Sequence, residues 1–106
     1  MTDAEQKALI TIALLAAFAD GNNNDTERAE VKRIAATLSR DSGIDISAIY
    51  QDVLLKRVSL DAAAAALTTT ESRNLAFELA VCVCDADGAR GDVEKAFLAD
   101  LRAKLA

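Results

Sequence analysis

One motif occurs twice in this sequence and constrains the fold more than any other feature. Ala-Asp-Gly is followed by three intervening residues, then Asp, one intervening residue and Glu, at residues 19–27 and again at 86–94. The offset, from position 20 to position 87, is 67 residues. An almost unbroken apolar segment precedes each copy, and apolar residues at helical spacing follow it. The sequence therefore predicts an internal pseudo-repeat of two helix-loop-helix units, over about residues 8–38 and 75–105.

The match between the two copies extends into their flanking segments. Two copies are too few for a solenoid, so we expect the apolar faces of the two units to pack on each other within a single domain, residues 1–106. The matched pairs include Ile10 with Phe77, Ile12 with Leu79, Ala13 with Ala80, Leu14 with Val81, Ala29 with Ala96 and Leu38 with Leu105.

The composition predicts an all-α fold. Proline is absent, glycine occurs only four times and alanine and leucine are abundant, so helix propensity is high over most of the 106 residues. We expect a compact bundle of about six helices in which the two units are related by a pseudo-two-fold arrangement. The expected helices cover about residues 3–19, 25–39, 45–57, 59–67, 68–84 and 92–105.

Local signals predict where these helices begin and which of them form the core. Thr2 with Glu5, and Thr68 with Glu71, are capping-box pairs that indicate the starts of the first and fifth helices. Both helices continue into segments that are apolar on nearly all sides, so we expect them at the centre, with the other four around them. On the second, third and sixth helices the expected inward residues are Val31, Ile34, Ala35, Leu38, Ile46, Ile49, Tyr50, Val53, Leu54, Phe97, Leu98, Leu101 and Leu105.

The two cysteines lie within the predicted fifth helix. Cys82 and Cys84 are separated by one residue, which places them on roughly opposite sides of a helix, so we expect no disulfide between them. We interpret both as small buried apolar residues, because their repeat partners are Leu15 and Ala17. A role in binding a soft metal or in thiol redox chemistry is the alternative.

The repeated motif itself has a simple explanation as helix capping. Gly21 after the first apolar helix suits the left-handed conformation that ends a helix. Asp25 or Asp92 can cap the helix that follows. Glu27 and Glu94, in the first turn, interact favourably with the positive end of the helix dipole. This interpretation needs no ligand.

Cation binding is the alternative interpretation. Asp20 and Asp87 fall in the last turn of a helix, where the macrodipole is negative and a carboxylate costs roughly 0.3 to 1 kcal/mol; Asp85 adds a further negative charge. A bound Ca²⁺, Mg²⁺ or Mn²⁺ would offset this repulsion. We call the two expected ligand sets the acidic corners: Asp20, Asp25 and Glu27 form the first, and Asp87, Asp92 and Glu94 form the second.

Neither corner is an EF-hand. Counted from Asp20, Asn22 and Asn24 suit the third and fifth positions of that calcium loop. Asp25, however, replaces the glycine required at the sixth position, and Val31 replaces the closing glutamate.

The charge composition and the absence of histidine exclude several classes of function. With 12 basic and 17 acidic residues the net charge is −5, and no segment combines basic and aromatic residues, so we expect no binding to nucleic acid. Histidine is absent, which removes the commonest general base and the usual catalytic zinc ligand, so we expect no enzyme activity. The apolar segment 8–19 would span about 18 Å as a helix, short of the roughly 30 Å hydrocarbon layer, and acidic residues precede it. We therefore expect a soluble cytoplasmic protein that does not insert into membranes.

The two motifs in their context, ALLAAFADGNNNDTERAEVKRIA and ELAVCVCDADGARGDVEKAFLADL, resemble the TerB-like family. That family includes the bacterial tellurite-resistance TerB proteins and the amino-terminal domain of the DjlA co-chaperones, and the resemblance covers essentially the whole chain. It implies an all-helical bundle with internal pseudo-symmetry, an acidic surface suited to divalent metals, no catalysis and a role in the tellurite or stress response. Thr26 and Val93 depart from the family at positions where relatives often carry proline or serine. The positions that match the family's acidic residues are Asp20, Glu27, Asp87 and Glu94.

Two functions follow from these observations. The first is a small helical domain that binds a divalent cation, Ca²⁺, Mg²⁺ or Mn²⁺, and reports or buffers it within a stress-response system. The second is a metal-free interaction module, whose acidic face binds a partner or whose exposed apolar residues self-associate. In both cases we expect the partners to be other stress-response proteins or a second copy of the chain.

Overall fold

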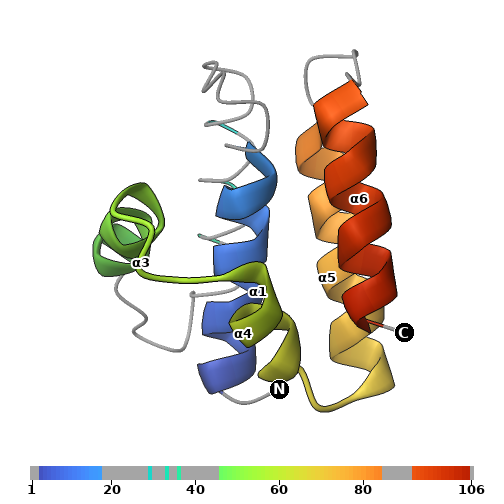
Figure 1. The fold of residues 1–106 in the computed structure, drawn as a ribbon. Helices are drawn as coiled ribbons and strands as arrows, with labels where there is room; N and C mark the ends of the chain where they lie inside the picture. The colour runs from blue at the N-terminus through green and yellow to red at the C-terminus, as the bar shows by residue number, and fades with distance from the viewer. Residues whose placement is uncertain are drawn as a thin grey trace.

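The structure, a computed structural model, describes residues 3–17, 29, 33, 36, 46–84 and 92–105 (Figure 1). In these residues the regular elements are all helices and no β-strand occurs, which confirms the predicted all-α class. The radius of gyration of 12.4 Å is that of a compact domain. The five helices are α1 (Asp3–Ala17), α3 (Ile46–Leu54), α4 (Leu60–Ala65), α5 (Thr70–Cys84) and α6 (Asp92–Leu105).

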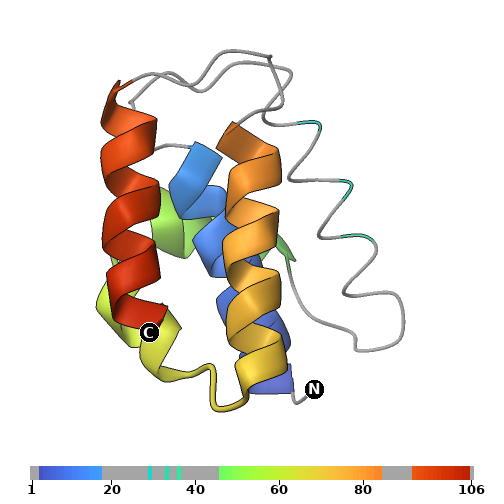
Figure 2. The same ribbon diagram turned by 90° about the vertical axis from the view of Figure 1, so that its right-hand side faces the viewer.

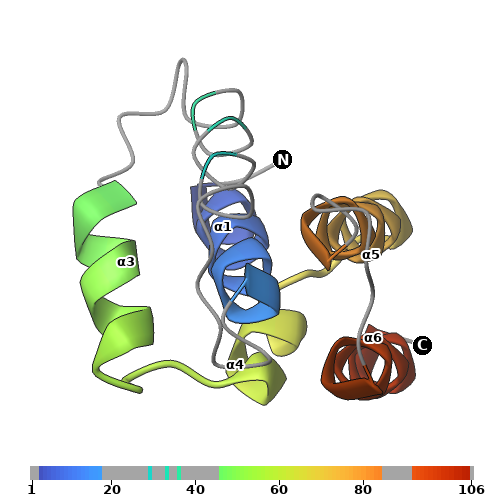
Figure 3. The same ribbon diagram turned by 90° about the horizontal axis from the view of Figure 1, so that it is seen from above.

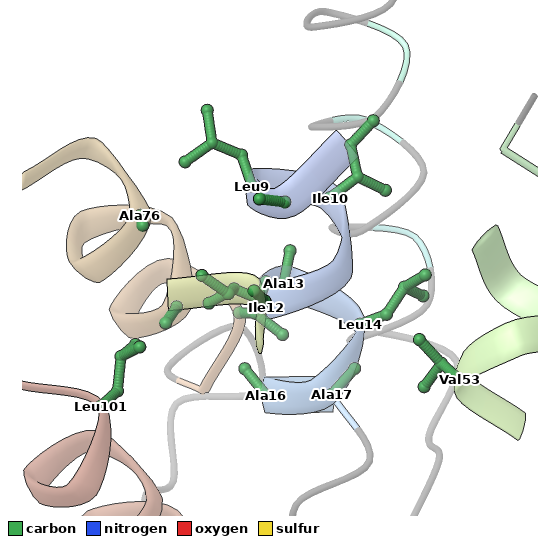
Figure 4. Close-up of a cluster of buried hydrophobic side chains, with 14 of the residues drawn as sticks. Leu9, Ile10, Ile12, Ala13, Leu14, Ala16, Ala17, Val53, Ala76 and Leu101 are labelled. Carbon is green, nitrogen blue, oxygen red and sulfur yellow. The ribbon is translucent and has the colours of Figure 1, made fainter. Parts of the chain in front are cut away.

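α1 lies at the centre of the molecule, with α3 on one side, α5 on the other and α4 packed across it (Figures 1 and 3). From Ala8 to Ala17 its residues are buried, apart from the half-buried Leu15. Figure 4 shows Leu14 beside Val53 of α3, whereas side chains of α5 and α6 approach α1 from the opposite side. A helix that is apolar all round is stable in water only when other elements cover every face, and α1 has such cover. Its predicted central position is confirmed.

α5 contributes less to the core than its apolar sequence predicts. Its buried residues lie along one face, whereas Leu79 is half-buried although its repeat partner Ile12 is fully buried. The physical reason is the number of neighbours: α1 packs against α3, α4, α5 and α6, whereas the described helices that chiefly contact α5 are α1 and α6. The buried residues of α5 are Ser72, Ala76, Ala80, Val83 and Cys84.

The two cysteines differ in environment. Both are free thiols, as expected, and Cys84 is buried. The prediction for Cys82 was wrong, because its side chain is exposed. Glu78 and Asn74, one and two turns earlier on the same face of α5, are also exposed, so position 82 continues an outward-facing line.

α3 ends at Leu54, three residues before the predicted end. Lys56 has φ of 57°, in the left-handed region. Its N–H donates to the carbonyl of Val53 (3.1 Å), and the N–H of Arg57 donates to the carbonyl of Asp52 (2.8 Å). This pair of bonds is the Schellman motif, with Lys56 at the position that glycine usually occupies. The backbone reversal therefore ends α3 early without any glycine to signal it.

Ser59 caps α4, as predicted. Its backbone is extended, and its Oγ accepts a hydrogen bond from the N–H of Ala62 (3.1 Å). The helix ends at Ala65, shorter than the expected end at Leu67. A serine at the N-cap satisfies one of the otherwise unbonded amides of the first turn, which is why the start of this short helix could be predicted.

The cap of α5 lies one residue later than predicted. The N–H of Ser72 donates to Thr69 Oγ1 (3.1 Å), and the N–H of Thr69 donates in return to Ser72 Oγ (3.4 Å). Thr69 with Ser72 therefore replaces the expected pair of Thr68 with Glu71. The serine hydroxyl performs the reciprocal role that glutamate has in the common capping box.

The remaining predicted inward residues agree with the structure wherever it describes them. Ile49, Val53, Leu98 and Leu101 are buried. Ala29, Arg33 and Ala36 are helical and exposed, within the range of the predicted second helix. Tyr50, Phe97 and Leu105 are partly buried against the core. The structure does not describe the side chains of the other predicted inward residues, Val31, Ile34, Ala35, Leu38, Ile46 and Leu54, or that of Thr2 in the first predicted capping box.

The described residues of α1 correspond to those of α5 under the repeat offset of 67 residues, and both segments are helical throughout. They lie side by side and run in the same direction, so that Ala17 and Cys84 end at the same end of the molecule (Figures 1 and 2). Within the described ranges, none of the helices has the length and hydropathy needed to cross a bilayer.

Candidate cation site at the acidic corners

Two of the seven predicted ligands, Asp92 and Glu94, belong to the residues that the structure describes. Both lie in the first turn of α6 and are the last two acidic residues of the second copy of the motif. The remaining predicted ligands lie outside the described residues: Asp20, Asp25, Glu27, Asp85 and Asp87.

Asp92 is the first residue of α6 and is exposed. The capping interpretation expected it before the helix, as the N-cap, whereas it lies inside the first turn. A carboxylate at this position still interacts favourably with the positive end of the helix dipole. Its exposure leaves it accessible to an ion or to a partner from solvent.

Glu94 is the third residue of α6, and only 4% of its surface is exposed. Burying a carboxylate is costly unless positive charge or hydrogen bonds compensate it. The N-terminus of α6 contributes part of that charge, equivalent to about half an elementary charge. Of the two described residues of the second corner, Glu94 is thus buried and Asp92 is exposed. No sequence signal distinguished its burial from the exposure of Asp92.

Glu5 provides an internal comparison. It is the third residue of α1, as Glu94 is of α6, and the same fraction of its surface, 4%, is exposed. No Ala-Asp-Gly motif precedes it. A buried glutamate in the first turn is therefore a feature that α1 and α6 share, and the capping interpretation accounts for both. What sets Glu94 apart is that it belongs to an acidic corner, with Asp87 and Asp92 before it in the sequence.

The ends of α1 and α5 bear on whether the two corners are close together. Each corner begins three residues after the last described residue of its helix, at Asp20 after Ala17 and at Asp87 after Cys84. Because the two helices are parallel neighbours, both segments depart from the same end of the molecule (Figure 2). In the part of the chain that the structure describes, no three acidic or thiol side chains are grouped closely enough to hold a metal ion.

Sequence reasoning missed one cluster of polar residues, which lies at the other end of α1. Lys7, Lys56 and Arg57 line a pocket beside α4. The adjacent Lys56 and Arg57 were a visible sequence signal, but nothing in the sequence indicated that Lys7, 49 residues earlier, would join them.

No protein-family model matches this chain, no curated protein is detectably similar to it, and no solved structure matches it. The resemblance to the TerB-like family therefore depends on the two motifs and their helical context alone.

Proposed function

We propose that this chain is a small, non-enzymatic helical domain of the TerB-like, stress-response type that binds a divalent cation at its acidic corners. The observation that carries the proposal is the buried carboxylate of Glu94, a member of the second corner, in the first turn of α6. A hard divalent cation prefers oxygen ligands, and Ca²⁺, Mg²⁺ and Mn²⁺ all fit a set of carboxylates. Asp92 and Asp87 would complete that set from the same corner.

The helix bounds support a repeat as the framework of the site. The described residues of α1 correspond under the offset of 67 to residues 70–84, which are also helical, and Asp25 corresponds under that offset to Asp92, the first described residue of α6. Ala29, Arg33 and Ala36 have helical geometry, as a second helix of the first unit requires. We therefore propose a bundle of two helix-loop-helix units whose acidic corners share one end of the molecule. Asp20, Asp25 and Glu27 would form the first ligand set, with Asp85 as a further ligand near the second.

The proposal extends to the setting of the protein. A bacterial cytoplasmic location and stress-response partners are supported by the TerB-like motifs, and the net charge of −5 favours cations over anionic partners.

The experiment is thermal unfolding of the full chain, with calorimetric titration, in metal-free buffer and in millimolar Ca²⁺, Mg²⁺ or Mn²⁺. An ion that binds only the folded state at a concentration of 100 Kd stabilises it by about 2.7 kcal/mol. We expect one of the three ions to raise the melting temperature, and Glu94→Gln to reduce that increase strongly.

Glu5→Gln is the matched control, because it removes an equally buried carboxylate from the same position of another helix. Its melting temperature is expected to fall in metal-free buffer while the response to the ion stays intact. If no ion shifts the unfolding of the wild-type chain, or if both variants lose the response equally, the cation site is disproved.

The metal-free interaction module is the second candidate. Val93, 52% exposed between Asp92 and Glu94, favours it, because an exposed apolar side chain beside an exposed acid suits a protein partner. Absence of any heat on titration with the three ions would leave this function as the better explanation of the corners.

A further inference from the structure

A basic pocket lies against the N-terminal half of α1. It has a volume of about 440 Å³ and is lined by residues of the N-terminal half of α1, of the connection from α3 to α4, and of α4 itself. Its floor is apolar and formed by alanines, among them the buried Ala8 and Ala63. The size is that of a typical small-molecule site.

Three cationic residues line this pocket: Lys7 from α1, and Lys56 and Arg57 from the α3–α4 connection. Among the described residues, no carboxylate lies within ion-pair distance of Lys7 or Lys56. Arg57 approaches Asp52 at 3.9 Å, the outer limit of an ion pair. Within the described part of the chain, Asp52 is therefore the one carboxylate within ion-pair distance of these three cations, in a protein whose net charge is −5.

The nearest acid on α4 is directed elsewhere. Asp61, in the first turn of that helix, forms an ion pair with Lys104 of α6 at 3.0 Å. Ser59, also in the lining, accepts a bond from Ala62 through Oγ, which leaves its hydroxyl hydrogen available to a ligand.

The backbone holds two of the cations in place at a conformational cost. Lys56 has φ of 57°, and the Schellman bonds of Lys56 and Arg57 fix both residues at the end of α3. A glycine would adopt this conformation without strain, yet it would remove one charge from the pocket.

We propose that this pocket binds a small, soluble phosphate monoester. A monoester carries a charge of about −1.5 to −2 at neutral pH and has three acceptor oxygens, which matches three cations better than a carboxylate with its single charge. Arginine and lysine together are suited to phosphate, the first as a fork of donors and the second as a point charge. The alanine floor would receive the apolar part of the molecule.

A lipid phosphate has the same headgroup chemistry, but the surroundings of the pocket favour a soluble molecule. The chain as a whole is acidic, and an anionic bilayer would repel it.

The test is calorimetric titration of the full chain with phenyl phosphate, with inorganic phosphate and with vesicles that contain phosphatidic acid. Lys56→Gly removes one cation and at the same time relieves the left-handed strain, so a loss of binding in this variant is not a loss of folding. We expect its affinity for phenyl phosphate to fall about tenfold, as for the loss of one charge-assisted contact. Lys95→Gln, which removes an exposed lysine from α6, is the matched control and should bind as the wild type does.

Ala62→Leu tests the apolar part of the proposal. Ala62 lines the pocket from α4, and leucine is a good helix former that would fill the space. This variant should lose affinity for phenyl phosphate and keep its weaker affinity for inorganic phosphate.

The outcomes separate the alternatives. The proposal is overturned if wild type does not bind phenyl phosphate, or if Lys56→Gly and Lys95→Gln bind it equally well. Inorganic phosphate that binds as tightly as phenyl phosphate would refute an organic ligand, and binding to vesicles alone would refute a soluble one. Because Glu94 is untouched in these variants, their failure would not affect the proposed cation site.

Discussion

At the scale of single residues, the most informative position is Lys56. In the left-handed region the Cβ atom of an L-residue approaches the following carbonyl oxygen, at a cost of about 1 to 2 kcal/mol. The two backbone hydrogen bonds of the Schellman motif hold Lys56 there nevertheless. These bonds satisfy carbonyl groups at the end of α3 that would otherwise lack partners within the helix.

Glycine and alanine substitutions at position 56 should show this strain directly. We expect Lys56→Gly to be more stable than Lys56→Ala by about 1 kcal/mol in free energy of unfolding, because glycine has no Cβ. Urea unfolding followed by circular dichroism measures the difference. The same pair at Lys95, a helical position of α6, should give the opposite order by a similar amount. A less stable glycine variant at position 56 would show that the residue is not strained.

At the scale of elements, α1 and α5 show how similar sequences acquire different roles. Both are 15-residue helices with long apolar segments. α1 is covered on all sides, whereas α5 keeps an outward line of exposed residues that includes Glu78 and Cys82. The apolar patterns of the two helices are alike, so the difference in their burial arises from the elements that pack against each helix.

Truncating one matched pair of residues should report this asymmetry. Ile12→Ala should lower the free energy of unfolding by about 2 to 5 kcal/mol, since it leaves a cavity at a fully buried site. Leu79→Ala, at the repeat partner, should cost clearly less. Part of the Leu79 side chain is already exposed to water, so its truncation removes less buried apolar surface. Urea unfolding of both variants under one condition provides the comparison. Equal costs would mean that α5 is as central as α1.

At the scale of the whole molecule, Lys104 connects the end of the chain to α4. Its Nζ lies 2.9 Å from Asp100 on its own helix and 3.0 Å from Asp61 on α4. The hydrogen bond to Asp100, and then that to Asp61, raise the pKa of Lys104 above its ordinary value of 10.5. α4 therefore packs on α1 and is also tied to α6, which closes the bundle on that side (Figure 3).

The pH dependence of this contact follows from the direction of the shift. A raised pKa in the folded state means that the stabilisation is fully present below pH 10.5 and is lost as the pH rises through the folded-state pKa. Lys104→Met should therefore lower the melting temperature at neutral pH, and the gap to wild type should narrow in strongly alkaline buffer. Arg102→Met, in the same last turn of α6, is the control for loss of charge alone. A gap that stays constant with pH would contradict the role of this lysine.

Much of the fold could be predicted from the sequence because helix formation is local. The serine cap of α4, the inward face of α6 and the central position of α1 all follow from residues a few positions apart. The end of α3 could not be predicted, since no glycine marks the left-handed residue. For the candidate cation site, the acidic residue types and their spacing were visible, but the burial of Glu94 was not.

What the sequence by itself determined is therefore the helical class and most helix starts, because caps and periodicity act within one turn or a few. Only the tertiary structure decided which apolar faces are covered, as the exposure of Cys82 and the half-burial of Leu79 show. It also decided that Lys7 would meet Lys56 and Arg57 around one pocket. Burial and charge clustering depend on contacts between residues far apart in the chain, and local sequence patterns do not predict those contacts.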